Sequence, residues 1–200
     1  QKVDYQRLSK FIDRTADPMP LMLYGPILKD RAEFIVYGND VPEYKGAVVI
    51  HARSRQHVVK RNWPVANWEW LVAELRNAGL ADRVICIGTE RDALAVPGCE
   101  DLRGLPLDGQ MDVLHSALVF IGPSSGPGHL ASLCKCPHVV WCGGEKGEHN
   151  ATIRIYLRDW NPFATPCRAE PRDNWQPHRE NVLQWVTEFM ATLGSKADAE

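Results

Sequence analysis

Short apolar runs and amphipathic segments alternate along the chain from residue 46 onward. The apolar runs cover residues 47–50, 83–87, 118–121 and 138–142, and each is short enough to be a buried strand. Apolar residues recur at helical spacing in segments 64–79, 111–117, 128–134 and 181–193. Strands that alternate with helices in this way are typical of βαβ units and predict a parallel sheet.

The fold class that this pattern indicates is α/β, with a Rossmann-like parallel sheet flanked by helices over residues 46–193. Residues 1–45 are broken repeatedly by proline and glycine, so we expect a connector or the remnant of an N-terminal domain. Residues 143–180 are expected to be irregular for the same reason. Residues 194–200 are expected to form a tail.

Composition narrows the classes of function. Hydrophobic residues make up 44% of the 200 residues and charged residues 24%, as in an ordinary globular protein. The formal net charge of −2 gives no basic field for nucleic acid, and no apolar run approaches the length of a transmembrane helix. No signal peptide is visible, so we expect a cytoplasmic location. The six cysteines lack zinc-finger spacing and are expected to be reduced thiols, and no metal site is predicted.

Three expected loops follow strands at the edge where such sheets bind ligands, at residues 51–62, 88–91 and 122–128. The last of them lies in IGPSSGPGH, which opens a helix. The free N–H groups and the dipole of a helix N-terminus attract anions, and glycine allows a ligand to approach the backbone. These properties predict a phosphate cradle, and its candidate residues are Ser124, Ser125, Gly126 and His129. The alternative is a plain strand-to-helix turn with a serine N-cap.

The first of these loops carries a cluster of cations. HARSRQHVVKRNWP contains Arg53, Arg55, Lys60 and Arg61 together with Ser54. Basic side chains gathered in one crevice suit a diphosphate, whereas the alternative is a solvated charged loop. Two loops suited to anions on the same edge of one sheet favour the diphosphate. The two tryptophans that follow, Trp63 and Trp68, are expected to pack the next helix.

Weaker candidates follow other strands. Glu90 is placed to meet a ribose, or it belongs to a polar turn. Leu102 and Gly104 lie in a short extended piece, residues 101–104, that is suited to line a nucleobase pocket through its backbone. Glu145 is placed to touch a sugar, or it belongs to a flexible acidic loop.

Four segments occur in order between residues 46 and 144: HARS followed by RNWP, VICIGTERD, DLRGLPL and FIGPSSGPGHLASLCKCPHVVWCGG. Together they resemble the C-terminal, donor-binding domain of glycosyltransferase family 9, the heptosyltransferase-like enzymes of the GT-B fold. The first two resemble the family's HPGAS followed by K-x-W-P and its strand-GG-x-x-E turn. The last two resemble its D-x-x-G-x-x-x-L segment and its D-S/T-G-x-x-H-L-A…G-x-P-x-V-x-L-F/W-G signature, which is the most specific of the four.

The resemblance implies one half of a GT-B glycosyltransferase, which binds a nucleoside-diphosphate sugar, usually an ADP-heptose. The acceptor would be a glycan or a lipid-linked, lipopolysaccharide-type molecule, with peripheral membrane association as a further expectation. Ser125, Gly126 and His129 match the family residues that face the donor diphosphate, Ser54 matches the hydroxyl position of the first loop, and Arg61 matches its lysine. Such enzymes need no metal or other cofactor when cationic side chains and helix N-termini neutralise the diphosphate.

Two departures from the family pattern bear on function. A GT-B enzyme has two Rossmann-like domains, and residues 1–45 are too few for the first of them, so we expect the N-terminal catalytic domain to be missing from this chain. Ser124 stands where the family usually has an aspartate. The alternative function is therefore a non-catalytic nucleotide- or sugar-binding module derived from such a domain.

Overall fold

The described part of the chain forms a six-stranded parallel sheet with helices on both faces. The computed structural model describes residues 38–143, 153, 156–161, 163–171 and 175–197. The strands are β1 (Val48–Ile50), β2 (Val84–Cys86), β3 (Glu100–Asp101), β4 (Val119–Pro123), β5 (His138–Cys142) and β6 (Cys167–Pro171). Their order in the sheet is β3-β2-β1-β4-β5-β6, and every neighbouring pair is parallel. The predicted α/β class and Rossmann-like sheet are confirmed.

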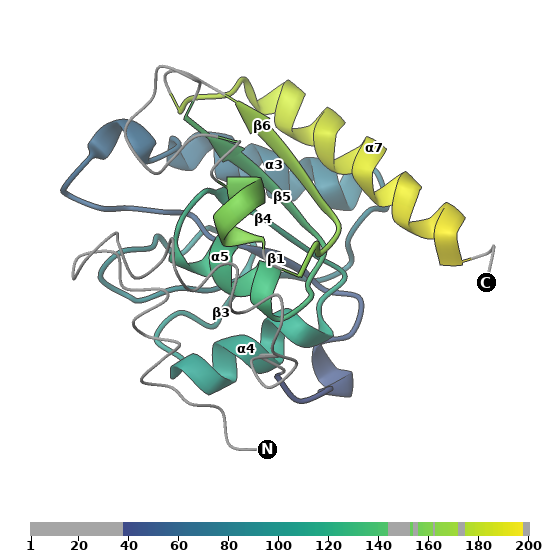
Figure 1. Ribbon diagram of the computed structural model, residues 1–200. Coiled ribbons are helices and arrows are strands. Elements are labelled where there is room, and N and C mark those ends of the chain that lie inside the picture. The colour runs from purple at the N-terminus through teal and green to yellow at the C-terminus, as the bar shows by residue number, and fades with distance from the viewer. Residues whose placement is uncertain (1–37, 144–152, 154–155, 162, 172–174, 198–200) are drawn as a thin grey trace.

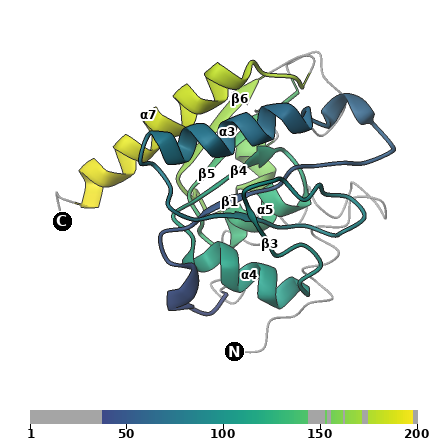
Figure 2. The same cartoon turned by 180° about the vertical axis from the view of Figure 1, so that it is seen from behind.

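Helices cover the two faces of the sheet in separate layers. The helices α4 (Leu107–Ser116) and α5 (Gly126–Leu133) lie in front of the sheet in Figure 1, and α3 (Val65–Asn77) and α7 (Arg179–Ala197) are in front in Figure 2. Val48 and Ile50 of β1 belong to the core under α3 and α7, whereas Val49 belongs to the core under α4 and α5. Because both faces are buried, a strand of this sheet reads as a continuous apolar run.

The helix α3 begins and ends where the sequence predicts. Pro64 is its N-cap residue, and Trp68 and Leu71 are fully buried at helical spacing. Gly79 follows the helix with a φ of +66°, the left-handed conformation that ends many helices. Trp63 packs edge-on against Trp68, with ring centroids 4.9 Å apart, so the packing role expected for the two tryptophans is confirmed.

Three elements differ from the sequence prediction. The strand β6 lies within residues 143–180, which were expected to be irregular, and so does a π-helical turn, η4 (Tyr156–Trp160). β6 reads CRAEP and is only half-buried at the sheet edge, so it lacks the apolar run by which the other strands were recognised. The helix α7 continues to Ala197, four residues into the segment expected to be a tail.

The segment before β1, residues 38–47, packs against the sheet domain. The backbone N–H groups of Asn39 and Val41 donate to the side chains of Asp112 and Ser116 on α4, at 2.6 and 2.8 Å. A short 3-10 turn, η2 (Pro42–Tyr44), then leads to β1. Most of the connector or remnant expected at residues 1–45, namely residues 1–37, lies outside the described residues. None of the described helices combines the length and the apolar character needed to cross a membrane.

Candidate functional site

The sheet order brings the two predicted loops together. The strands β1 and β4 are neighbours although β2 and β3 lie between them in the sequence, so the chain direction across the sheet reverses here. In the register, Ile50 is opposite Ile121, and the N–H of His51 donates to the Ile121 carbonyl at 3.1 Å. Ligands of open α/β sheets bind at such a switch point. The loop after β1 and the turn before α5 therefore face the same ligand-binding edge.

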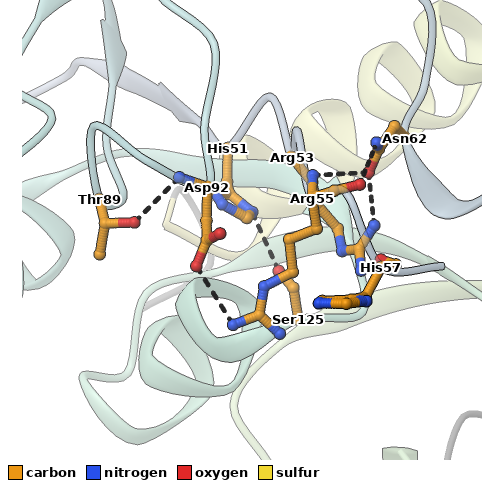
Figure 3. A network of polar contacts seen from close by, with 8 residues as sticks. All are labelled: His51, Arg53, Arg55, His57, Asn62, Thr89, Asp92 and Ser125. Carbon is orange, nitrogen blue, oxygen red and sulfur yellow. Dashed lines mark hydrogen bonds and ion pairs between the residues drawn. The ribbon is translucent and has the colours of Figure 1, made fainter. Parts of the chain in front are cut away.

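The turn before α5 presents Ser125 and Gly126. Ser125 is the N-cap residue of α5 and Gly126 is its first helical residue, and both are half-buried. The Oγ of Ser125 makes no capping hydrogen bond to the helix and lies 3.0 Å from the Nδ1 of His51. Figure 3 shows these two side chains turned toward each other. The N-terminus of α5 thus lies directly after β4, at the edge predicted for ligands, and anion binding there stays a prediction.

Ser124 and His129 lie beneath this turn rather than on it. The two residues are 2% and 1% exposed, and the Ser124 Oγ is 3.3 Å from the His129 Nε2. The His129 ring stacks on Trp160, with centroids 3.9 Å apart and planes 11° apart. The structure therefore places this pair as buried support for the start of α5. A direct contact of either residue with a diphosphate stays a prediction.

The cationic loop is held in shape by Asn62, which the sequence analysis did not single out. Its Oδ1 accepts hydrogen bonds from the Arg53 guanidinium at 2.5 Å and from the backbone N–H of Arg55 at 3.1 Å (Figure 3). Its Nδ2 donates to the Arg55 carbonyl at 2.8 Å. Arg53 is only 5% exposed and also donates to the carbonyl of Val58, so it serves the loop from within. No local sequence signal marks Asn62, because its partners lie up to nine positions away.

Arg55 is exposed and forms an ion pair with the loop that follows β2. Its guanidinium lies 3.3 Å from the Asp92 carboxylate, and the two side chains are 57% and 32% exposed. The backbone N–H of Ser54 donates to the Asp92 carbonyl at 2.8 Å. These two contacts join the loops after β1 and β2, and Ser54 is held at the point where the loops meet.

Lys60 and Arg61 belong to a 3-10 turn, η3 (Val59–Arg61). The Arg61 guanidinium lies over the Trp175 ring, 4.2 Å from its centroid. Gln176 donates to the backbone carbonyl of Lys60 at 2.7 Å and to that of Asn62 at 2.9 Å. The end of the cationic loop therefore packs on the segment that leads into α7. A contact of Lys60 or Arg61 with a ligand stays a prediction.

The weaker candidates meet at the end of β2. Gly104 has a φ of +83°, and a Cβ built on it would lie 3.3 Å from the Glu90 Oε1, so the Glu90 side chain rests against this glycine. The N–H of Gly104 donates to the Gly88 carbonyl at 2.8 Å, and that of Leu102 donates to the Cys86 carbonyl at 3.0 Å. Glu145 lies outside the described residues.

His51, at the centre of the site, is kept neutral by its surroundings. Burial, together with the neighbouring Arg53 and Arg55 guanidinium groups, lowers the pKa of His51 to about 3. His51 is 4% exposed and remains neutral at physiological pH. Among the described residues, no group of three or more His, Cys, Asp or Glu side chains is arranged to hold a metal ion.

Neither a scan of protein-family models nor a search of curated proteins found a match to this chain. Solved structures do match it. E. coli ADP-heptose LPS heptosyltransferase II superposes with a TM-score of 0.57 at 13% identity, over 89% of this chain and 53% of that chain. The glycosyl transferase family 9 protein from Veillonella parvula gives a TM-score of 0.54 at 11% identity, over 74% and 47%.

A third match is E. coli heptosyltransferase WaaC with ADP, with a TM-score of 0.51 at 19% identity, over 72% of this chain and 44% of that chain. This chain thus spans about half the length of the structures that it resembles. At these identities the likeness is one of fold. The chain has the α/β fold of one half of a GT-B glycosyltransferase, as found in the heptosyltransferases of family 9.

Proposed function

We propose that this chain is the donor-binding half of a glycosyltransferase and that it binds a nucleoside-diphosphate sugar. The observation that carries the proposal is the meeting of the loop after β1 with the start of α5, joined by the contact between His51 and Ser125. The diphosphate lies where the loop after β1 and the start of α5 meet. Ser125 and Gly126 supply a hydroxyl and a backbone amide, and Arg55 on the loop supplies an exposed positive charge.

This arrangement suits the leaving group of sugar transfer. When the bond between the sugar and the diphosphate breaks, negative charge accumulates on the phosphate oxygens. A helix N-terminus, a hydroxyl donor and guanidinium groups stabilise that charge in a fixed geometry and need no metal ion. Lys60 and Arg61 add positive charge at the same loop.

The rest of the donor lies along the carboxyl ends of β2 and β3. Glu90 accepts hydrogen bonds from the ribose, and the backbone around Leu102 and Gly104 lines the nucleobase pocket. ADP is the first nucleotide to test, because the matching WaaC structure contains ADP and another match is an ADP-heptose heptosyltransferase. The acceptor is a glycan or a lipid-linked molecule.

Isothermal titration with ADP and UDP tests the proposal. We expect one of them to bind with 1:1 stoichiometry, and Ser125→Ala and Arg55→Ala each to weaken binding about tenfold, the usual loss for a hydrogen bond to a charged group. Arg76→Ala is the matched control. Arg76 is also an exposed arginine, but it contacts Gly98, which precedes β3 and so lies at the amino-terminal ends of the strands. Absence of binding by either nucleotide, or an equal loss in Arg76→Ala, contradicts the proposal.

A second candidate is a non-catalytic nucleotide- or sugar-binding module. The observation in its favour is Ser124, a buried hydroxyl bonded to His129 where the family it resembles usually has an aspartate. This candidate predicts that the nucleotide binds without sugar transfer. Release of ADP from an ADP-sugar that depends on an added acceptor, measured on this chain joined to an N-terminal GT-B half, excludes it.

A further inference from the structure

Ser125 occupies the N-cap position of α5 but does not cap the helix. An N-cap serine ordinarily accepts a hydrogen bond from the backbone N–H of the second or third helical residue. The second residue here is Pro127, which has no N–H, so Gly128 is the remaining capping target. Ser125 makes no such bond, and its Oγ lies 3.0 Å from the Nδ1 of His51. The contact with His51 replaces the cap.

The His51 ring is held in one place. The backbone N–H of His51 donates to β4, and the residue is 4% exposed between the loops that follow β1 and β2. Gly88 makes room for it, because a Cβ at that position would lie 2.9 Å from the ring Cδ2. A ring confined in this way fixes the direction of the Ser125 hydroxyl.

The His51 ring acts by geometry rather than by charge. With its pKa lowered to about 3 by burial and by Arg53 and Arg55, it is a neutral imidazole with one N–H donor and one lone pair. The Ser125 hydroxyl is able to donate and to accept at the same time. A phosphate oxygen that accepts a hydrogen bond from the Ser125 hydroxyl therefore selects the tautomer in which the His51 Nδ1–H donates to Oγ.

We propose that His51 is a positioning residue, which holds the Ser125 hydroxyl away from α5 so that both the hydroxyl and the first amides of the helix serve the diphosphate. This role rests on the proposed function of the site. Without His51, the hydroxyl turns to the Gly128 amide and caps the helix. The ligand then loses a donor and competes with Ser125 for the helix N-terminus.

A pair of matched variants tests the role. His51→Asn retains a hydrogen-bonding atom close to the position of Nδ1, whereas His51→Leu places a methyl group there, and both remove the outer atoms of the ring. We expect His51→Leu to bind ADP about five- to tenfold more weakly than His51→Asn, the usual effect of one hydrogen bond. In the Ser125→Ala background, this difference between the two variants should vanish.

A second measurement is independent of the nucleotide. Hydrogen exchange of the Gly128 amide should be slower in His51→Leu than in His51→Asn, because only the former releases Ser125 to cap the helix. Equal ADP affinities of the two variants, or a difference that persists without Ser125, overturns the positioning role. If the wild-type chain binds neither ADP nor UDP, the proposed function fails and the role in ligand binding falls with it. The Gly128 exchange rate then reports only whether His51 keeps Ser125 from capping the helix.

Discussion

Gly88 lies beside the His51 ring, where a side chain would strain the backbone and press on the site. Its φ of +125° is a conformation that L-residues rarely adopt, which costs an alanine about 1–3 kcal/mol. An alanine Cβ would also lie 2.9 Å from the His51 ring and 3.0 Å from the Ala93 Cβ. Overpacking of this kind costs about 1–3 kcal/mol. The two terms together predict that Gly88→Ala lowers the free energy of unfolding by about 4 kcal/mol.

Gly79→Ala is the control that separates strain from contact. Gly79 also has a positive φ, +66°, but a Cβ there would meet no atom within 4 Å, so only the left-handed penalty of about 1 kcal/mol remains. For a domain of this size, 1 kcal/mol shifts Tm by about 2–4 °C. Thermal melts followed by circular dichroism should show a loss of about 8–16 °C for Gly88→Ala and about 2–4 °C for Gly79→Ala. Equal losses would refute the reasoning that the His51 ring fills the space beside Gly88.

Two further predictions concern the cationic loop and the buried histidines. Asn62→Ala removes three hydrogen bonds and should lower the free energy of unfolding by about 2 kcal/mol, with faster amide exchange in the loop, whereas the exposed Asn77→Ala should change it by less than about 0.5 kcal/mol. Burial lowers the pKa of His51 to about 3 and that of His138 to about 4, so the unfolded chain binds protons that the folded chain does not below pH 6.5. Stability should therefore be full above pH 6.5 and fall by about 1.4 kcal/mol per pH unit for each histidine as the pH drops toward 4. Urea unfolding at pH 7.5 and 5.0 measures this loss, and His138→Gln should remove one histidine's share of it.

The buried strands could be predicted because burial on both faces leaves a mark on each strand alone. Val48 and Ile50 pack under α3 and α7 and Val49 under α4 and α5, so all three positions must be apolar. β6 leaves no such mark. It is an edge strand stabilised by its pairing with β5, and its Arg168 and Glu170 form an ion pair at 2.9 Å. Its existence depends on a neighbour and not on its own pattern.

The candidate site was predictable as a pair of loops but not as a set of contacts. The glycines and serines of the turn before α5 and the cations of the loop after β1 are visible in the sequence. The roles of His51 and Asn62 are not, because each depends on which side chain comes to lie beside it. The sequence also does not separate Arg55, exposed and paired with Asp92, from Arg53, which is buried and holds the loop.

The sequence by itself determined the layered α/β fold, the strand-to-helix turn at Ser125 and the cationic loop, because apolar periodicity, glycine, proline and charge act over a few neighbouring residues. Only the tertiary structure decided that β1 and β4 lie side by side. That adjacency places the His51 ring 3.0 Å from the Ser125 hydroxyl, across 74 positions of sequence. The tertiary structure also decided that Ser124 and His129 are buried and that Ser125 and Gly126 are partly accessible. Exposure and side-chain contact are set by the packing of segments distant in sequence, which no local pattern encodes.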